Sequence, residues 1–160
     1  MNWIDFIIIV IMLGITVVEM KRGFGKAVFD FAALLVAIRG AYMLQGPLSD
    51  VIKLTLRPAT DKAILFAALF IVIGGGLMYL GRLLYSTTLI SAEFFEPLLG
   101  GICGIGMGII LSHALMRIIA LGSGSDAPIV ISTSALGKEF LTFDSYHRLV
   151  EFLYNFNQQE

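Results

Sequence analysis

Four apolar stretches, each long enough to cross a lipid bilayer as a helix, constrain what this chain can fold into. A hydrocarbon core of about 30 Å needs roughly 20 apolar residues in helical conformation. The stretches that meet this requirement are residues 3–20, 26–44, 63–85 and 98–121. The first lacks the small-residue cleavage site of a signal peptide, so we expect it to span. We therefore predict an all-α integral membrane protein with a four-transmembrane-helix bundle over residues 1–121.

The composition agrees with a membrane protein and excludes other classes. Hydrophobic residues make up 58% of the chain and charged residues 14%, whereas soluble domains average about 45–50% and 25%. A net charge of −1 provides no basic surface, so we expect no nucleic-acid partner. Cys103 is the single cysteine, and His113 and His147 lie far apart. We therefore predict neither a metal site nor a cofactor.

The connections between the apolar stretches differ in length. Residues 21–25, KRGFG, predict a tight hairpin turn, since Gly23 and Gly25 tolerate turn conformations. The second connection contains Pro47 and Pro58, and its residues 49–56, SDVIKLTL, predict a short helix on the membrane surface. In the third, Pro97 suits the first turn of the last spanning helix.

Residues 122–160 predict a linker followed by a C-terminal amphipathic helix. GSGSDAP, residues 122–128, has the composition of a flexible linker. In residues 143–156, apolar and polar side chains then recur with the period of an α-helix. The apolar face comprises Phe143, Tyr146, Leu149, Val150 and Leu153, and the polar face Asp144, Arg148, Glu151 and Asn155. This helix is too short to span, so we expect it on the membrane surface, on the bundle or on a partner.

Ionisable residues at membrane depth are costly and are therefore candidates for function. Asp5 and Arg39 lie about 25 and 22 Å from the hairpin turn at 1.5 Å per residue. Their similar height predicts an Asp5–Arg39 ion pair, and the alternative is that each side chain reaches water by itself. Asp30 faces away from Arg39 along its helix, and its predicted partner is Arg82. Asp30 would then either tether two helices or exchange protons in ion coupling.

Ser112 and His113 do not form a catalytic pair. Adjacent helical side chains point about 100° apart, and no third residue completes a triad. We therefore predict no catalytic residue and no enzymatic activity.

Small residues spaced four apart form stripes on two of the expected helices. Gly100, Gly104, Gly108 and Ser112 share one face, as do Ala33, Ala37 and Ala41. Such small-xxx-small patterns let membrane helices approach closely. We predict that the helices of residues 26–44 and 98–121 pack through these stripes. The alternative is contact between the glycine stripes of two copies, which would make a homo-oligomer. The glycine spacing does not fit a dinucleotide-binding fingerprint.

The positive-inside rule gives no single orientation. The hairpin side carries Lys21, Arg22, Lys26 and Arg82. The opposite side carries Lys53, Arg57, Lys62, Arg117, Lys138 and Arg148. The raw count favours the second group, whereas density near the first spanning helix favours the first.

The opening WIDFIII, the segment RGFGKAVFDF and the glycine-stepped fourth helix together resemble the colicin V production (CvpA) family of bacterial inner-membrane proteins. The resemblance covers roughly residues 2–120. Trp3, Asp5, Gly23 and the Gly100, Gly104 and Gly108 series match best. Relatives often carry an Asp-Arg pair where this chain has Glu96 and Pro97, and some carry Arg at the position of Met107. Roles of those arginines do not transfer to this chain.

The resemblance implies a multi-pass protein of the bacterial inner membrane, associated with production or export of a toxin. Some relatives are fused to a protease domain outside the cytoplasm, which implies that both termini lie outside. We predict a non-enzymatic accessory or scaffold protein for colicin or bacteriocin production and envelope function. The alternative is an oligomeric channel or transporter component in which Asp5, Asp30 and Arg39 line a polar route. Expected partners are the lipid bilayer, further copies of the chain, and membrane or export proteins.

Overall fold

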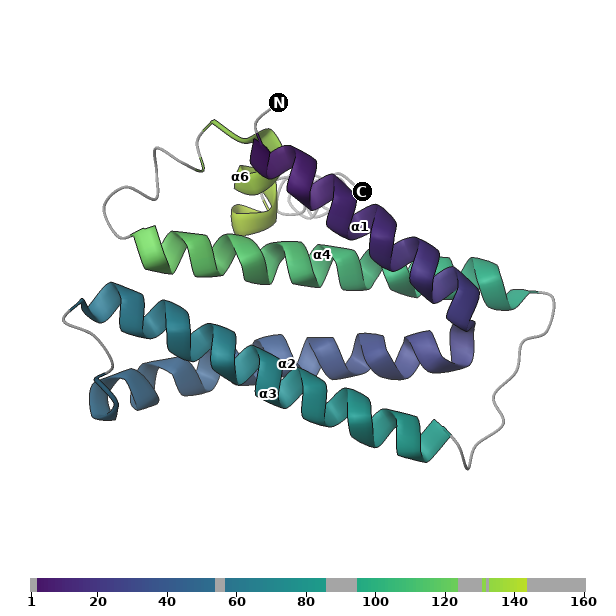
Figure 1. The fold of residues 1–160 in the computed structure, drawn as a ribbon, viewed down its shortest axis with the longest axis horizontal. Helices are drawn as coiled ribbons and strands as arrows, with labels where there is room; N and C mark the ends of the chain where they lie inside the picture. Colours follow the sequence, from purple (N-terminus) through teal and green to yellow (C-terminus); the bar gives the residue numbers. More distant parts are fainter. Residues whose placement is uncertain (1–2, 54–56, 86–94, 124–130, 132, 144–160) are drawn as a thin grey trace, which may run out of the picture.

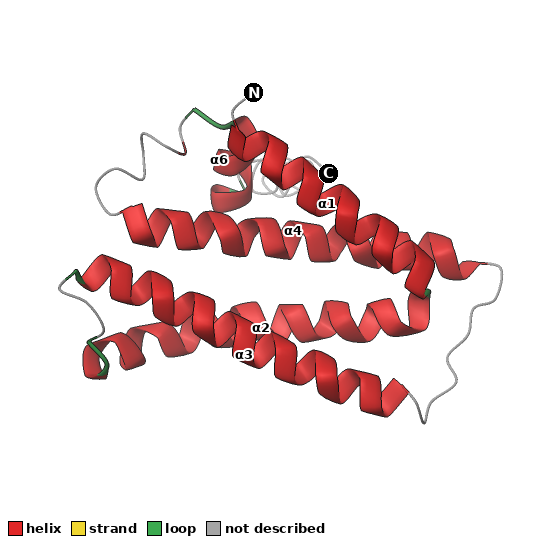
Figure 2. Ribbon diagram, in the orientation of Figure 1, coloured by secondary structure: helices red, strands yellow, loops and turns green. Residues whose placement is uncertain are grey.

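A computed structural model describes residues 3–53, 57–85, 95–123, 131 and 133–143 (Figure 1). These residues form helices and contain no strand (Figure 2). The helices are α1 (Trp3–Arg22), α2 (Phe24–Val51), α3 (Pro58–Tyr85), α4 (Glu96–Ser123) and α6 (Ala135–Thr142). The predicted all-α fold is confirmed.

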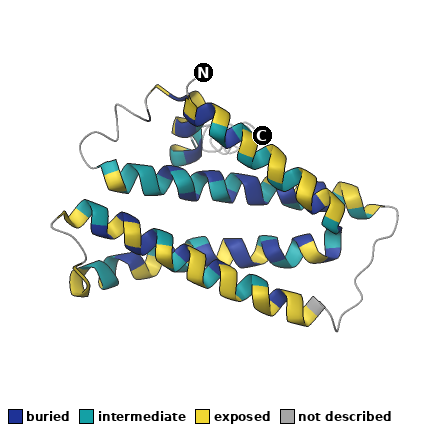
Figure 3. Ribbon diagram, in the orientation of Figure 1, coloured by how far each residue is buried: buried dark blue, intermediate teal, exposed yellow. Residues whose placement is uncertain are grey.

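Four of the helices have the length and hydropathy of membrane spans. They are α1, α2, α3 through Leu84, and α4. Large apolar side chains such as Phe6, Leu13 and Ile71 are exposed on their outer faces (Figure 3). In a bilayer these side chains contact lipid rather than water, so their exposure costs nothing there.

The second connection is shorter than the sequence predicts. α2 continues through Pro47 to Val51, and Pro58 occupies the first turn of α3. Pro47 lies inside α2, four residues before its last residue, so it removes one hydrogen bond of the final turns without ending the helix. A separate surface helix over residues 49–56 is therefore wrong for residues 49–53, and residues 54–56 lie outside the described part.

The C-terminal segment contributes one short helix. α6 lies beside the start of α1 and contacts both α1 and α4 (Figure 1). It precedes the stretch predicted to be amphipathic, of which only Phe143 lies within the described residues. The prediction for residues 144–156 and most of the predicted linker fall outside them.

The four long helices pack as two pairs. α1 packs mainly on α4, and α2 mainly on α3, while α4 also contacts both α2 and α3 (Figure 1). The core between the pairs is apolar. Its buried members are Leu34, Ala37, Ala41, Phe66, Phe70, Met107, Ile110 and Ala114.

The glycine stripe of α4 lies directly on the backbone of α1. A Cβ atom at Gly100 would lie 2.6 Å from the carbonyl oxygen of Glu19, and one at Gly104 2.7 Å from the Cα of Thr16. At Gly108 it would lie 3.0 Å from the Cα of Met12. The prediction that this stripe packs on α2 is therefore wrong, since three successive turns of α4 contact α1.

The alanine stripe of α2 has a different neighbour. A Cβ at Gly74 of α3 would lie 3.4 Å from the Cβ of Ala37, an ordinary packing distance. Ala33, Ala37 and Ala41 are all buried, and the last two join Phe66 of α3 in the core. The two stripes are predicted to contact each other. Instead, the glycine stripe of α4 packs on α1, and the alanine stripe of α2 packs on α3.

Two further glycines of α4 also lie at close contacts. A Cβ at Gly106 would lie 2.6 Å from the ring of Phe31 on α2. A Cβ at Gly101 would lie 2.9 Å from the side chain of Met20 on α1. These two positions, which lie off the Gly100–Gly104–Gly108 stripe, thus widen the surface on which α1 and α2 approach α4.

We predict that Gly104→Leu destabilises the bundle by about 1–3 kcal/mol or more, because the side chain would overlap the backbone of α1. Gly75→Leu is the matched control, since a Cβ at Gly75 meets nothing within 4 Å. Thermal unfolding in detergent micelles, followed by circular dichroism, measures both. Equal melting temperatures for the two variants would contradict the α1–α4 contact.

Candidate functional site: a charged cluster at the α1–α2 turn

A single glycine makes the turn between α1 and α2. Gly23 follows the last residue of α1 and has a φ of 83°, a conformation that L side chains rarely adopt. Its N–H donates to the carbonyl oxygen of Glu19 at 3.0 Å. A Cβ here would also lie 3.0 Å from Oε2 of Glu96, at the start of α4. The turn therefore needs glycine for its backbone angle, whereas the flexible Glu96 side chain could move away from a Cβ.

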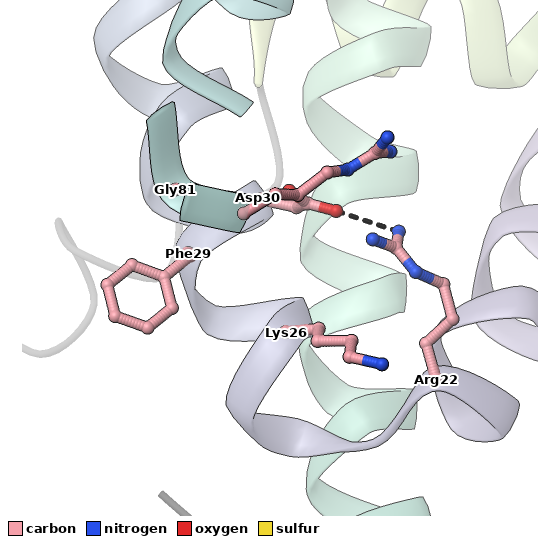
Figure 4. Close-up of a pocket in the computed structure, with 6 residues that line it drawn as sticks. Arg22, Lys26, Phe29, Asp30 and Gly81 are labelled. Atoms are coloured by element: carbon pink, nitrogen blue, oxygen red, sulfur yellow. Dashed lines mark ion pairs between the residues drawn. The ribbon is translucent and has the colours of Figure 1, made fainter. Parts of the chain in front are cut away.

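Arg22 connects the two helices on either side of this turn. Its Nη1 lies 2.6 Å from Oε1 of Glu19 on α1. The same atom lies 2.7 Å from Oδ2 of Asp30 on α2 (Figure 4). The two carboxylates are buried, each with 3% of its side chain exposed, whereas the Arg22 side chain is 28% exposed. One guanidinium thus pairs with two buried carboxylates.

This arrangement leaves some polar atoms without full compensation. Oε2 of Glu19 is buried and has no hydrogen-bond partner among the described residues. The Arg22–Asp30 contact brings opposite charges together without hydrogen-bond alignment, so Oδ2 of Asp30 also lacks an aligned donor. Buried carboxylates of this kind are costly unless a cation stays beside them. The stability of this end of the bundle therefore depends on Arg22.

A small pocket of about 70 Å³ opens beside the cluster. Its lining comprises Arg22, Lys26, Phe29, Asp30, Gly81 and Arg82 (Figure 4). Arg82 is exposed and lies at the same end of the bundle as the α1–α2 turn, as the sequence predicted. The predicted Asp30–Arg82 pair is nevertheless wrong, because Asp30 pairs with Arg22.

Asp5 lies at the opposite end of α1 and binds α6. Its Oδ1 accepts a hydrogen bond from Oγ of Ser134 at 2.5 Å and another from the backbone N–H of Leu136 at 3.0 Å. The Oγ of Ser134 also accepts from the N–H of Gly137, which caps the helix. A buried carboxylate thus holds the positive N-terminal end of α6 against α1.

The predicted Asp5–Arg39 pair is therefore wrong. Asp5 is 2% exposed and bonded to the start of α6. Arg39 lies at a comparable height but is exposed and lines a cavity between α2 and α4. Equal height along two helices does not imply that their side chains face each other, and α1 and α2 diverge from their turn (Figure 1).

His113 and Ser112 have separate environments. Nδ1 of His113 lies 2.5 Å from the carbonyl oxygen of Phe140, and the ring stacks on Tyr42. Ser112 is fully buried, and its Oγ has no hydrogen-bond partner among the described residues. The described residues as a whole include no group of three or more His, Cys, Asp or Glu side chains placed to bind a metal.

The sequence reasoning missed two residues that organise these sites. Arg22 enters the sequence prediction only as one of the positive charges on the hairpin side, although its position eight residues before Asp30 across a one-residue turn could have suggested contact. Ser134 carries the usual signal of a helix N-cap, a serine before good helix formers. Its partner Asp5 is 129 residues away, so no local pattern identifies it.

The buried charges form two separate groups. Asp5 and Glu19 lie 14 residues apart on α1, which is about 21 Å. Between them, α1, α3 and α4 contribute apolar side chains such as Ile8, Phe70 and Ile110 to the interior. Among the described residues, Asp5, Asp30 and Arg39 do not form a continuous polar route through one copy of the chain.

We predict that Arg22→Met lowers the free energy of unfolding by about 3 kcal/mol. This value is the lower end of the range for breaking a buried ion pair, and we choose it because the Arg22 side chain is partly exposed. Arg82→Met is the control and should change the free energy of unfolding by less than about 0.5 kcal/mol. Adding Glu19→Gln and Asp30→Asn to Arg22→Met should recover most of the loss. Denaturant unfolding in micelles tests this, and equal losses for Arg22→Met and Arg82→Met would refute the assignment.

Comparison with known proteins gives one match. The family model described as "Colicin V production protein" matches residues 4–143. No curated protein and no solved structure matches the chain. The match begins at the start of α1 and ends just after α6, so it includes the charged turn, the glycine stripe and the Asp5–Ser134 contact. This membrane-spanning chain therefore belongs to the colicin V production protein family.

Proposed function

We propose that this protein is a non-enzymatic accessory or scaffold of the bacterial inner membrane that supports production or export of colicin-type toxins. The family match over residues 4–143 carries this proposal. The packing of α1 on α4 through glycines supports a rigid element rather than a mobile one, since backbones in contact leave little freedom to move.

The density of positive charge beside α1, in contrast to the total count over the chain, supports an orientation with both termini outside the cytoplasm. Lys21, Arg22 and Lys26 gather at the α1–α2 turn, and Arg82 lies at the same end. Positively charged residues close to the first spanning helix have the greatest influence on orientation. The turn would then face the cytoplasm, and α6 would lie on the outer side.

The channel or transporter alternative receives less support. A polar route would have to connect the Asp5 and Asp30 regions, yet the interior between them is apolar in the described chain. Such a route would need residues from several copies. Reconstituted protein that conducts ions, with a current altered by Asp30→Asn, would favour this alternative over a scaffold.

The proposed role is tested in a strain that produces colicin V and lacks its own family member. Expression of this chain should restore secreted toxin activity. Gly104→Leu should fail to restore it, whereas the matched control Gly75→Leu should succeed. Normal toxin secretion in the deleted strain, or failure of the chain to restore it despite normal membrane levels, would contradict the proposal.

Orientation is tested by cysteine labelling in a Cys103→Ala background. We predict that Lys21→Cys reacts with a membrane-impermeant maleimide only after the inner membrane is permeabilised. Lys53→Cys, at the opposite end, should react in spheroplasts with an intact inner membrane. The reverse pattern would place both termini in the cytoplasm.

A further inference from the structure

A cavity of about 240 Å³ lies between α2, α4 and the residue that follows α6. Most of its wall is apolar or aromatic, and two basic side chains, Arg39 and His113, also line it. The remaining lining residues are Ile38, Tyr42, Ile109, Ile110 and Phe143. Apolar walls with a few polar groups are typical of ligand sites.

The charge around this cavity is positive. Arg39 lines it from α2, and the guanidinium of Arg117 lies 4.9 Å from the ring centroid of Tyr42. No carboxylate belongs to the lining residues. Asp5, the acid at a comparable height, is bonded to Ser134 and Leu136 instead. Arg39 thus has no acidic side chain beside it among the lining residues of this cavity.

The end of α6 is held against this cavity by His113. A carbonyl oxygen can only accept a hydrogen bond, so Nδ1 of His113 donates to Phe140. The imidazole also lies near the rings of Tyr42 and Phe143, with centroid distances of 6.3 and 5.1 Å. These contacts fix the aromatic wall of the cavity.

We propose that this cavity binds the phosphate of an anionic phospholipid, with Arg39 as the principal contact. A guanidinium presents paired N–H donors that match phosphate oxygens. Basic pockets between membrane helices are suited to anionic headgroups. Arg39 lies about 22 Å along α2 from the turn, close to the far boundary of a hydrocarbon core of about 30 Å. Its side chain therefore reaches the level of the lipid phosphates.

The apolar walls favour a lipid over a free phosphate ion. Ile38, Ile109 and Phe143 offer no hydrogen bonds to a hydrated anion. They suit the glycerol and upper acyl carbons that follow a headgroup phosphate. The inference concerns what binds this cavity and does not depend on the proposed role in toxin production.

Native mass spectrometry of the full chain released from micelles tests the proposal, with phosphatidylglycerol and phosphatidylcholine as probes. The wild type should retain phosphatidylglycerol preferentially. Arg39→Gln should weaken that retention about fivefold or more, the effect of removing one cation near an anionic headgroup. Lys53→Gln, which removes an exposed charge at the same end but outside the cavity, should leave it unchanged.

Three results would overturn the proposal. One is equal retention in Arg39→Gln and Lys53→Gln, and another is equal retention of the two lipids by the wild type. The third is displacement of phosphatidylglycerol by inorganic phosphate or glycerol phosphate at equal concentration, which would indicate a site for the free ion. Should Arg39→Gln fail to fold, Arg39→Lys replaces it, since lysine keeps the charge without the paired donors. This variant should retain less phosphatidylglycerol than the wild type does, but more of it than the wild type retains of phosphatidylcholine.

Discussion

The contact of the α1 backbone with the glycines of α4 is the interaction on which the rest of the structure depends. Gly100 and Gly104 leave space for the backbone around Glu19 and Thr16, so the end of α1 lies against the start of α4. Glu19 is buried as a result, and its carboxylate needs a cation. Arg22 supplies that cation and, across the Gly23 turn, also reaches Asp30 on α2. The uncharged contact between the α4 glycines and the α1 backbone thus determines where the buried charges lie.

Each end of the bundle uses its charges for a different structural purpose. At the turn, Arg22 ties α1 to α2, two helices that otherwise contact each other little. At the other end, Asp5 ties α1 to the N-terminus of α6. The residues that looked like candidates for a polar route therefore act mainly as connectors in one chain. Arg39 is the exception, since it faces a cavity whose lining provides no acid.

The sequence predicted the helices well and their neighbours poorly. Hydropathy identifies the four spans because the bilayer thickness sets their length, and the tight turn at Gly23 follows from its glycines. The partner of each stripe does not follow, because small residues at Gly104 and at Ala37 permit close approach to any helix. Pairings such as Asp5 with Ser134 join residues far apart in sequence. They depend on how the helices are arranged in space, which the periodicity of apolar residues does not reveal.

Disulfide formation between α1 and α4 tests the central contact most directly. A Cβ at Gly108 would lie 3.4 Å from the Cβ of Met12, close to the separation found in disulfides. In a Cys103→Ala background, Met12→Cys combined with Gly108→Cys should cross-link within one chain in native membranes. Gly108→Cys combined with Ala37→Cys should not cross-link. A bond in the second pair, or covalent dimers of the Gly108→Cys variant without an internal bond in the first, would contradict the account.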